Sequence, residues 1–130
     1  MGDDTWLTVF PTAFHPTMSH DFDSFNVEDL HTVNNGFIDN LFPFLTDSSQ
    51  AYAWGVLIGH FVGVDHVGRR VGPDYPTMLA KQQHMNDVLK RVVNAIDQNT
   101  QLFILGDHEM DRNRDHSGGG GPGVSASLWI

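Results

Sequence analysis

Residues 53–59 read Ala-Trp-Gly-Val-Leu-Ile-Gly, and residues 101–105 read Gln-Leu-Phe-Ile-Leu. Both runs are short and apolar, which is typical of strands covered on both faces of a parallel sheet. Between them, Pro76 begins a stretch to about Gln98 with apolar residues at helical spacing, and proline is tolerated in a first helical turn. The predicted apolar stripe comprises Met78, Leu79, Met85, Leu89, Val92, Val93 and Ile96. Strand, helix and strand in this order predict a βαβ unit and an α/β fold.

The segments around this unit carry weaker patterns. A helix is expected over residues 26–45, with Asn26 as its cap and Asn35-Gly36 as an interruption or kink. Residues 1–25 have no sustained period and are expected to be irregular. Polar loops are expected over residues 65–74 and 111–123, and a last strand is expected over residues 124–130.

Composition limits the classes of function that the chain can have. With 130 residues, 40% of them hydrophobic, the chain is long enough for one globular domain. The formal net charge of -9 argues against nucleic acid or an anionic membrane surface as the main partner. Cysteine is absent, which excludes disulfides, thiolate zinc sites and cysteine nucleophiles. The sequence contains no signal peptide and no membrane-spanning run.

Asp-His pairs are the main chemical signal in the sequence. Asp65-His66 follows the first predicted strand, Asp107-His108 follows the second, and Asp115-His116 lies in the next loop. In open α/β sheets, ligands bind beyond the carboxyl ends of the strands. Carboxylates mixed with imidazoles suit zinc or manganese, and paired metals can stabilise a phosphoryl transfer. The alternative, that each aspartate only caps a turn, stays open on this evidence alone.

The spacing of these pairs resembles a known family. Residues 65–76 (Asp-His-Val-Gly-Arg-Arg-Val-Gly-Pro-Asp-Tyr-Pro) resemble the Asp-His-x-Gly-His-Arg-x-Gly-Pro-x-His-Pro stretch of GPI ethanolamine phosphate transferases, which belong to the alkaline phosphatase superfamily. Residues 106–110 (Gly-Asp-His-Glu-Met) resemble their Gly-Asp-His-Gly-Met, and residues 115–118 (Asp-His-Ser-Gly) resemble their Asp-His-Gly-Gly. Residues 2–6 and 29–33 also match. The similarity therefore runs in order along essentially the whole chain.

The resemblance implies a fold and an activity. The fold would be a partial alkaline-phosphatase-like α/β/α sandwich with a mostly parallel sheet, in which residues 1–130 are a fragment lacking the N-terminal strands. The activity would be transfer of phosphoethanolamine from phosphatidylethanolamine to a mannose of the GPI-anchor precursor. It would take place on the lumenal side of the endoplasmic reticulum membrane, with membrane association through segments not in this chain. Nucleic acid is not an expected partner.

The resemblance also implies a two-metal centre with zinc or manganese as the divalent ions. Asp107 and His108 would bind one metal, and Asp65 and His116 would bind the other. The family's nucleophilic threonine corresponds to a position upstream of this chain, so no catalytic residue is assigned within it. We therefore expect the chain alone to be inactive. Two alternatives remain: a truncated, inactive metal-binding remnant, or a phosphodiesterase of the same superfamily.

Several positions depart from the family pattern. Arg69 stands where the family has a metal-binding histidine, and a guanidinium stays protonated and cannot act as a ligand. Glu109, Arg114 and Ser117 replace small or glycine positions, and glycine there would serve tight turns. His66 is expected to be a neighbour of the ligands or solvated, rather than a ligand itself.

Overall fold

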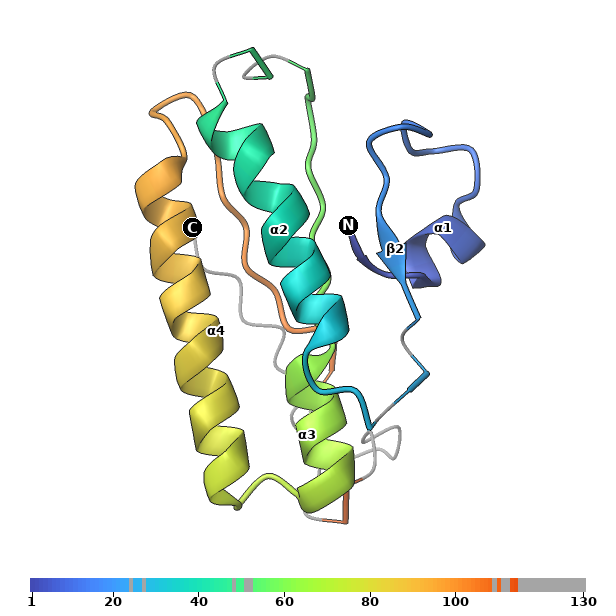
Figure 1. Ribbon diagram of the computed structural model, residues 1–130, viewed down its shortest axis with the longest axis vertical. Helices are drawn as coiled ribbons and strands as arrows, with labels where there is room; N and C mark the ends of the chain where they lie inside the picture. Colours follow the sequence, from blue (N-terminus) through green and yellow to red (C-terminus); the bar gives the residue numbers. More distant parts are fainter. Residues whose placement is uncertain are drawn as a thin grey trace. The chain divides into compact units, whose positions relative to one another are not determined.

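A computed structural model describes residues 1–23, 25–26, 28–47, 49–50, 53–108, 110 and 113–114. Its elements are, in chain order, β1 (Gly2–Asp3), α1 (Thr5–Val9), β2 (Asp21–Phe22), α2 (Thr32–Thr46), α3 (Gly63–Val71) and α4 (Pro76–Ala95) (Figure 1). The chain divides into two compact units, Met1–His66 and Val67–Ile130. It combines helices with parallel strand pairing, as α/β folds do, although the strands are very short.

The short strand β1 is bonded by two other segments of the first unit. It pairs in parallel with β2, with Gly2 opposite Asp21, and Gly2 also forms a parallel bridge to His60. The Met1 amino group donates to the Ile58 carbonyl at 2.9 Å, and the His60 N–H donates to the Met1 carbonyl at 3.0 Å. Gly2 has φ 111°, and a Cβ at this position would collide with the His60 backbone. Only glycine permits this close approach.

Helix α2 supplies most of the apolar core of the first unit, and it packs against both β1 and β2 (Figure 1). The Phe37 ring meets the Phe61 ring edge to face, with their centroids 4.2 Å apart. Aromatic pairs in this geometry stabilise a core beyond the area that they bury. The buried apolar residues of this unit are Val33, Phe37, Leu41, Phe44 and Val62.

Helix α2 begins later than the sequence pattern predicts. The expected helix over residues 26–45 begins only at Thr32, and the described residues before it, 26 and 28–31, are not helical. The Asn26 side chain accepts the Glu28 N–H at 3.2 Å, which makes a local turn rather than a helix cap. The Asp29 carboxylate then accepts the Thr32 N–H at 2.8 Å. Asn26 as the cap is therefore wrong, because an aspartate nearer the helix takes the N–H at its start.

The expected interruption at Asn35-Gly36 is also wrong, because α2 runs through it without a break. The Phe22 ring lies directly over Gly36, where a Cβ would collide with it. The Gly36 carbonyl accepts a bond from the Asn40 amide at 2.7 Å. The glycine thus lets a ring from β2 approach the helix backbone, and it does not break the helix.

The second unit is built on α4, which confirms the predicted helix start at Pro76. The predicted end near Gln98 is wrong, because the backbone turns extended at Ile96 and the helix ends at Ala95. Its buried positions follow the three- and four-residue spacing of one helical face. Leu79 and Val93 were predicted on that face, but they are 57% and 53% exposed because they lie about one residue's rotation away from it. The buried residues of α4 are Met78, Lys81, Met85, Val88 and Val92.

Helix α3 replaces the polar loop predicted over residues 65–74. Asp65 lies in its first turn, and Arg69 and Arg70 lie in its last turn. This charge order complements the helix dipole and stabilises a short helix. The helix ends at Val71, and the next residue, Gly72, has φ 97° and donates its N–H to the Gly68 carbonyl at 2.8 Å. The loop prediction overlooked this charge order and the terminal glycine.

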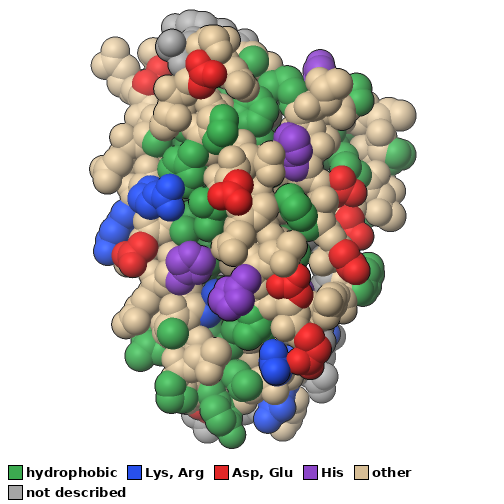
Figure 2. Space-filling model, viewed as in Figure 1, with side chains coloured by type: hydrophobic (Ala, Val, Ile, Leu, Met, Phe, Trp, Pro, Cys, Tyr) green, Lys and Arg blue, Asp and Glu red, His purple; other side chains and the backbone are tan. Residues whose placement is uncertain are grey.

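Both predicted buried strands are wrong, because residues 53–59 and 101–105 contain no β-strand. Val56 is 80% exposed, and Leu105 is 65% exposed. An apolar run favours an extended backbone, but a strand forms only where a neighbouring segment completes the hydrogen-bonded ladder. Figure 2 shows hydrophobic side chains reaching the surface among polar ones.

Two other predictions concern the ends of the chain. Residues 1–25 were predicted to be irregular, but they contain β1, α1 and β2. The glycine-rich loop over residues 111–123, apart from 113 and 114, and the strand over residues 124–130 fall outside the described part of the chain. None of the helices within the described part has both the length and the apolar character needed to cross a membrane.

Gly59 should tolerate no side chain, whereas Gly55 should tolerate one. A Cβ at Gly59 would collide with the buried Phe37 ring, while a Cβ at Gly55 would meet nothing within 4 Å. We expect Gly59→Ala to lower the free energy of unfolding by about 1–3 kcal/mol, as overpacking does. Gly55→Ala is the matched control and should change it by less than about 0.5 kcal/mol. Urea unfolding followed by tryptophan fluorescence measures both, and equal effects would contradict the packing described for Phe37.

Candidate metal centre

Asp65 lies half-buried in the first turn of α3. The next residue, His66, is only 1% exposed, so the alternative of a solvated His66 is wrong. Its Nδ1 lies 2.9 Å from the Asp29 carbonyl oxygen. Because a carbonyl oxygen only accepts, Nδ1 must carry the proton and donate it. This bond fixes the tautomer of the ring beside the candidate ligand.

Asp29 is an ionised anchor at the start of α2. Its pKa falls from the ordinary value of 3.8 to about 2, mainly through the Thr32 side chain and then through the N–H groups of Thr32 and His31. The Asp29 carboxylate accepts those N–H groups at 2.8 and 3.0 Å. One residue therefore holds α2 through its carboxylate and His66 through its carbonyl.

Asp107 and His108 present two metal-binding atoms side by side. Asp107 Oδ2 lies 3.5 Å from His108 Nε2, and Asp107 Oδ1 accepts the His108 N–H at 3.0 Å. Both side chains are open to solvent, with 63% of Asp107 and 33% of His108 exposed. Two ligand atoms on one tetrahedral zinc ion lie about 3.4 Å apart, given ordinary Zn–O and Zn–N lengths. The chemistry and the spacing of this pair therefore fit a shared metal ion.

Two described residues after this pair, Met110 and Arg114, contact α3 within the second unit. The Met110 side chain fills the space beside Gly68, where a Cβ would collide with its sulfur. Arg114 donates from its guanidinium to the Arg70 carbonyl at 3.1 Å. Arg114 also has φ 71°, the left-handed conformation that favours glycine. The expectation of a glycine-like turn is thus confirmed at Arg114.

The structure brings together only part of the predicted ligand set. Asp107 and His108 are adjacent in the second unit, whereas Asp65 belongs to the first unit. His116 falls outside the described residues. Within the described ranges, no group of three or more His, Cys, Asp or Glu side chains is placed to hold a metal ion. Arg69, four residues after Asp65, is exposed on α3.

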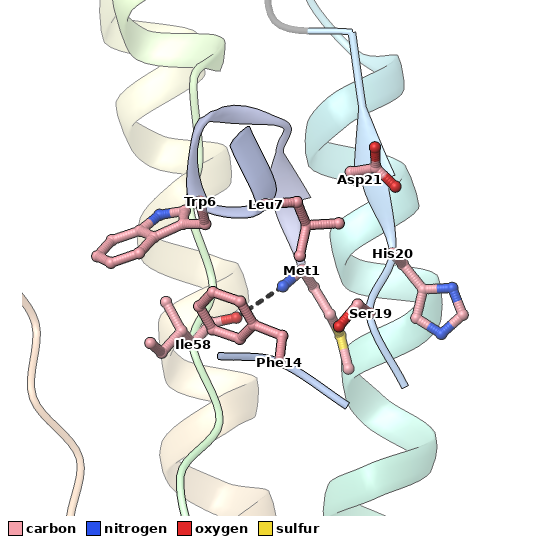
Figure 3. Close-up of a pocket in the computed structure, with 8 residues that line it drawn as sticks. All are labelled: Met1, Trp6, Leu7, Phe14, Ser19, His20, Asp21 and Ile58. Carbon is pink, nitrogen blue, oxygen red and sulfur yellow. Dashed lines mark hydrogen bonds between the residues drawn. The ribbon is translucent and has the colours of Figure 1, made fainter. Parts of the chain in front are cut away.

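Two cavities of the first unit lie apart from the candidate ligands. Figure 3 shows the smaller one, of about 20 Å³, which has room for roughly one water molecule. It is lined by Met1, Trp6, Leu7, Phe14, Ser19, His20, Asp21 and Ile58. The larger cavity, of about 220 Å³, lies against residues 53–58. None of Asp65, Asp107 and His108 lines either cavity.

Comparison with known proteins places the chain in a family. The family described as Type I phosphodiesterase / nucleotide pyrophosphatase matches residues 5–119. The chain belongs to this family of phosphodiester-processing domains. Over its full length it is 45% identical to the catalytic subunit of GPI ethanolamine phosphate transferase 3 from Mus musculus and to that from Homo sapiens. It is 39% identical to GPI ethanolamine phosphate transferase 3 from Schizosaccharomyces pombe.

These relatives are much longer proteins. The chain spans 11% of the mouse and human transferases and 14% of the fission yeast one. No solved structure matches the chain. The resemblance that the motifs indicated is confirmed, and it extends over every residue of the chain.

Sequence reasoning missed two residues that hold the helices near Asp65, namely Asn34 and Asp29. Asn34 is 1% exposed, and its side-chain oxygen accepts the N–H of Gly63 at the start of α3. Nothing local in the sequence marks Asn34, because its partner lies 29 residues away. Asp29 could have been found, because an aspartate three residues before Thr32 has the spacing of a residue that holds a helix start.

Asp29 should stabilise the chain in a pH-dependent way. Its lowered pKa means that its stabilising effect is complete above pH 3.8 and is lost as the pH falls toward 2. We expect Asp29→Ala to lower the free energy of unfolding by about 1 kcal/mol at pH 7, which is typical for loss of an acceptor at a helix start. The deficit should shrink between pH 3.8 and 2.

Urea unfolding at several pH values provides the measurement. Asp39→Ala is the control, because Asp39 lies exposed in the middle of α2 and away from its first N–H groups. A deficit of the same size at pH 7 and pH 2 would show that the Asp29 charge does not act at the helix start.

Proposed function

We propose that the protein carrying this chain transfers phosphoethanolamine from phosphatidylethanolamine to a mannose of a GPI-anchor precursor. The observation that carries the proposal is the 3.5 Å separation of Asp107 Oδ2 and His108 Nε2, on a segment that resembles a family motif. The names of the mouse and human relatives support the transferase activity and the GPI acceptor. On this proposal, the chain contributes metal ligands to the catalytic domain of a longer protein.

The proposed ligands divide into two sets. Asp107 and His108 hold one divalent ion, and Asp65 and His116 hold the other. Zinc or manganese would neutralise charge on the phosphoryl oxygens and lower the pKa of a nucleophile. The short strands would belong to the mostly parallel sheet of an α/β/α sandwich. We assign no catalytic residue within this chain.

The chain's own residues would prepare this centre before the substrate arrives. Asp107 points one carboxylate oxygen at the N–H of His108 and leaves the other beside the imidazole. After the pair, Met110 contacts Gly68 and Arg114 donates to the Arg70 carbonyl.

The site of action would be the lumenal face of the endoplasmic reticulum membrane. GPI-directed relatives support a membrane setting, since their acceptor is a lipid-linked glycan. Membrane attachment would come through segments other than this chain. Nucleic acid is not proposed as a partner, because the net charge of -9 would repel its phosphates.

Hydrolysis of phosphodiesters or nucleotide pyrophosphates is the second candidate function. The family description itself favours it, because the matching family is named for phosphodiesterases and nucleotide pyrophosphatases. Both reactions use the same ligand types, so the metal centre cannot separate them. The acceptor separates them: water in hydrolysis, and a mannose hydroxyl in transfer.

Loss of the Asp107–His108 pair should abolish transfer. We expect Asp107→Asn and His108→Gln each to reduce the rate at least about 100-fold, because each removes a proposed metal ligand. His84→Gln is the control, because His84 is exposed on α4. The assay follows label from phosphatidylethanolamine into GPI precursors in membranes that contain the whole protein. If the unmodified protein hydrolyses a nucleotide pyrophosphate and does not label GPI precursors, the transferase proposal is wrong and the second candidate function is favoured.

Arg69 should lower the affinity for the metal ion that Asp65 is proposed to bind. A permanent positive charge four residues after Asp65 opposes a cation and supplies no ligand. We expect Arg69→His to raise the bound zinc toward two ions per protein, as measured by elemental analysis after gel filtration. Arg70→His is the matched control on the same exposed turn of α3 and should leave the zinc content unchanged. An unchanged zinc content in Arg69→His would contradict the ligand role given to that position.

A further inference from the structure

Lys81 is a buried positive charge that the proposed function does not use. It is only 5% exposed and lies on the buried face of α4 with Met78, Met85 and Val88. A lysine is almost never buried this completely unless its ammonium group is balanced by a negative charge or by hydrogen-bond acceptors. Lys90, on the same helix, shows the ordinary situation, because its side chain is 65% exposed.

The face of α4 that carries Lys81 meets the segment that carries the candidate ligands. A Cβ built on Gly68 would lie 3.4 Å from the Met78 methyl group and would collide with the Met110 sulfur. Both methionine side chains therefore reach the same point on α3. Lys81 follows Met78 by three residues, which is about one helical turn and about 4.5 Å along the axis.

The direction of the chain brings Lys81 and the Asp107–His108 pair to the same side of this contact. After α4 the chain turns back and runs in the opposite direction to the helix (Figure 1). Residues that precede Met110 therefore lie beside turns of α4 that follow Met78. His108 precedes Met110 by two residues, which is at most about 7 Å of extended chain. Lys81 and the pair thus lie at about the same level along α4.

Asp107 is the described carboxylate best placed to balance Lys81. The described part of the second unit has carboxylates at Asp74, Asp87, Asp97 and Asp107. Asp87 forms an ion pair with Lys90 at 3.4 Å, and Asp97 accepts hydrogen bonds from residues just after it. Asp74 is exposed in the turn before α4. Among these four, only Asp107 lies on the segment that meets the Lys81 face of α4.

From this placement we infer that Lys81 is the buried counter-charge of the Asp107–His108 pair. Its ammonium group offsets the Asp107 carboxylate and repels a divalent cation that binds to the pair. The repulsion is weakly screened, because Lys81 is shielded from water. Lys81 therefore lowers the affinity of the pair for a metal ion without being a ligand. The inference rests on the proposed function, since it takes Asp107 and His108 as metal ligands.

A purely structural role of Lys81 predicts the opposite result. If Lys81 only supported the packing of α4, its replacement would loosen the segment and weaken metal binding. If Lys81 acts through its charge, replacement by an apolar side chain strengthens metal binding. Methionine is the suitable replacement, because it is unbranched and Met78 and Met85 already flank position 81 on this face.

The experiment titrates Zn²⁺ into the 130-residue chain by isothermal titration calorimetry. We expect Lys81→Met to raise the affinity at least about 5-fold, because it removes the opposing charge. Lys81→Arg keeps the charge and should change the affinity by less than about 2-fold. Lys90→Met is the matched control on the exposed side of α4, and it should also change the affinity by less than about 2-fold because an exposed charge is screened.

Asp107→Asn separates the inference from the proposed function. If it weakens Zn²⁺ binding while Lys81→Met leaves the affinity unchanged or lowers it, the counter-charge role is overturned and the ligand role stands. If Asp107→Asn leaves Zn²⁺ binding unchanged, both the ligand role and the counter-charge role are overturned.

A measurement on the native lysines keeps the test valid if Lys81→Met does not fold. The chain has two lysines, so labelling with lysine that carries ¹³C at Cε gives two signals, and Lys90→Arg assigns them. We expect Zn²⁺ to shift the Lys81 signal and to leave the Lys90 signal in place, and we expect Asp107→Asn to remove the shift. A Lys81 signal that stays in place while Zn²⁺ binds to the pair overturns the counter-charge role.

Discussion

The hydrogen bond from the Gly63 N–H to the Asn34 side chain is the constraint on which the first unit depends. It satisfies a helix N–H that would otherwise be buried without a partner, and it joins α2 to the start of α3. The bond from His66 to the Asp29 carbonyl reinforces it three residues later, in the same turn of α3. Because leaving a buried polar group unbonded is costly, these contacts specify one arrangement of the two helices.

The candidate metal ligands lie in two different structural environments. Asp65 emerges from a helix turn fixed by buried polar bonds, whereas Asp107 and His108 lie on an exposed segment followed by the Met110 and Arg114 contacts. The two proposed ligand sets also differ in their electrostatic surroundings, because Arg69 places a positive charge four residues after Asp65. On the proposed assignment, this charge would make metal binding tighter at the Asp107–His108 pair than at Asp65.

Local patterns predicted some elements well and others badly. The helix beginning at Pro76 was correct, because a proline start and a long apolar stripe lie within one stretch of sequence. The strands over residues 53–59 and 101–105 were wrong, because strand formation requires a partner that local composition does not supply. Helix α3 was mistaken for a loop, although Asp65 and Arg69 already had the charge order of a helix.

The sequence by itself determined the family, the Asp-His pairs and the start of α4, because each depends on residues close together in the chain or on motifs in order. The tertiary structure alone decided that Asn34 meets Gly63, that His66 meets Asp29, and that residues 58–60 border β1. These contacts join residues 29 to 58 positions apart, and no local pattern encodes such a pairing. The Asp-His pairs could therefore be identified from the sequence, whereas the contacts that fix the first turn of α3 could not.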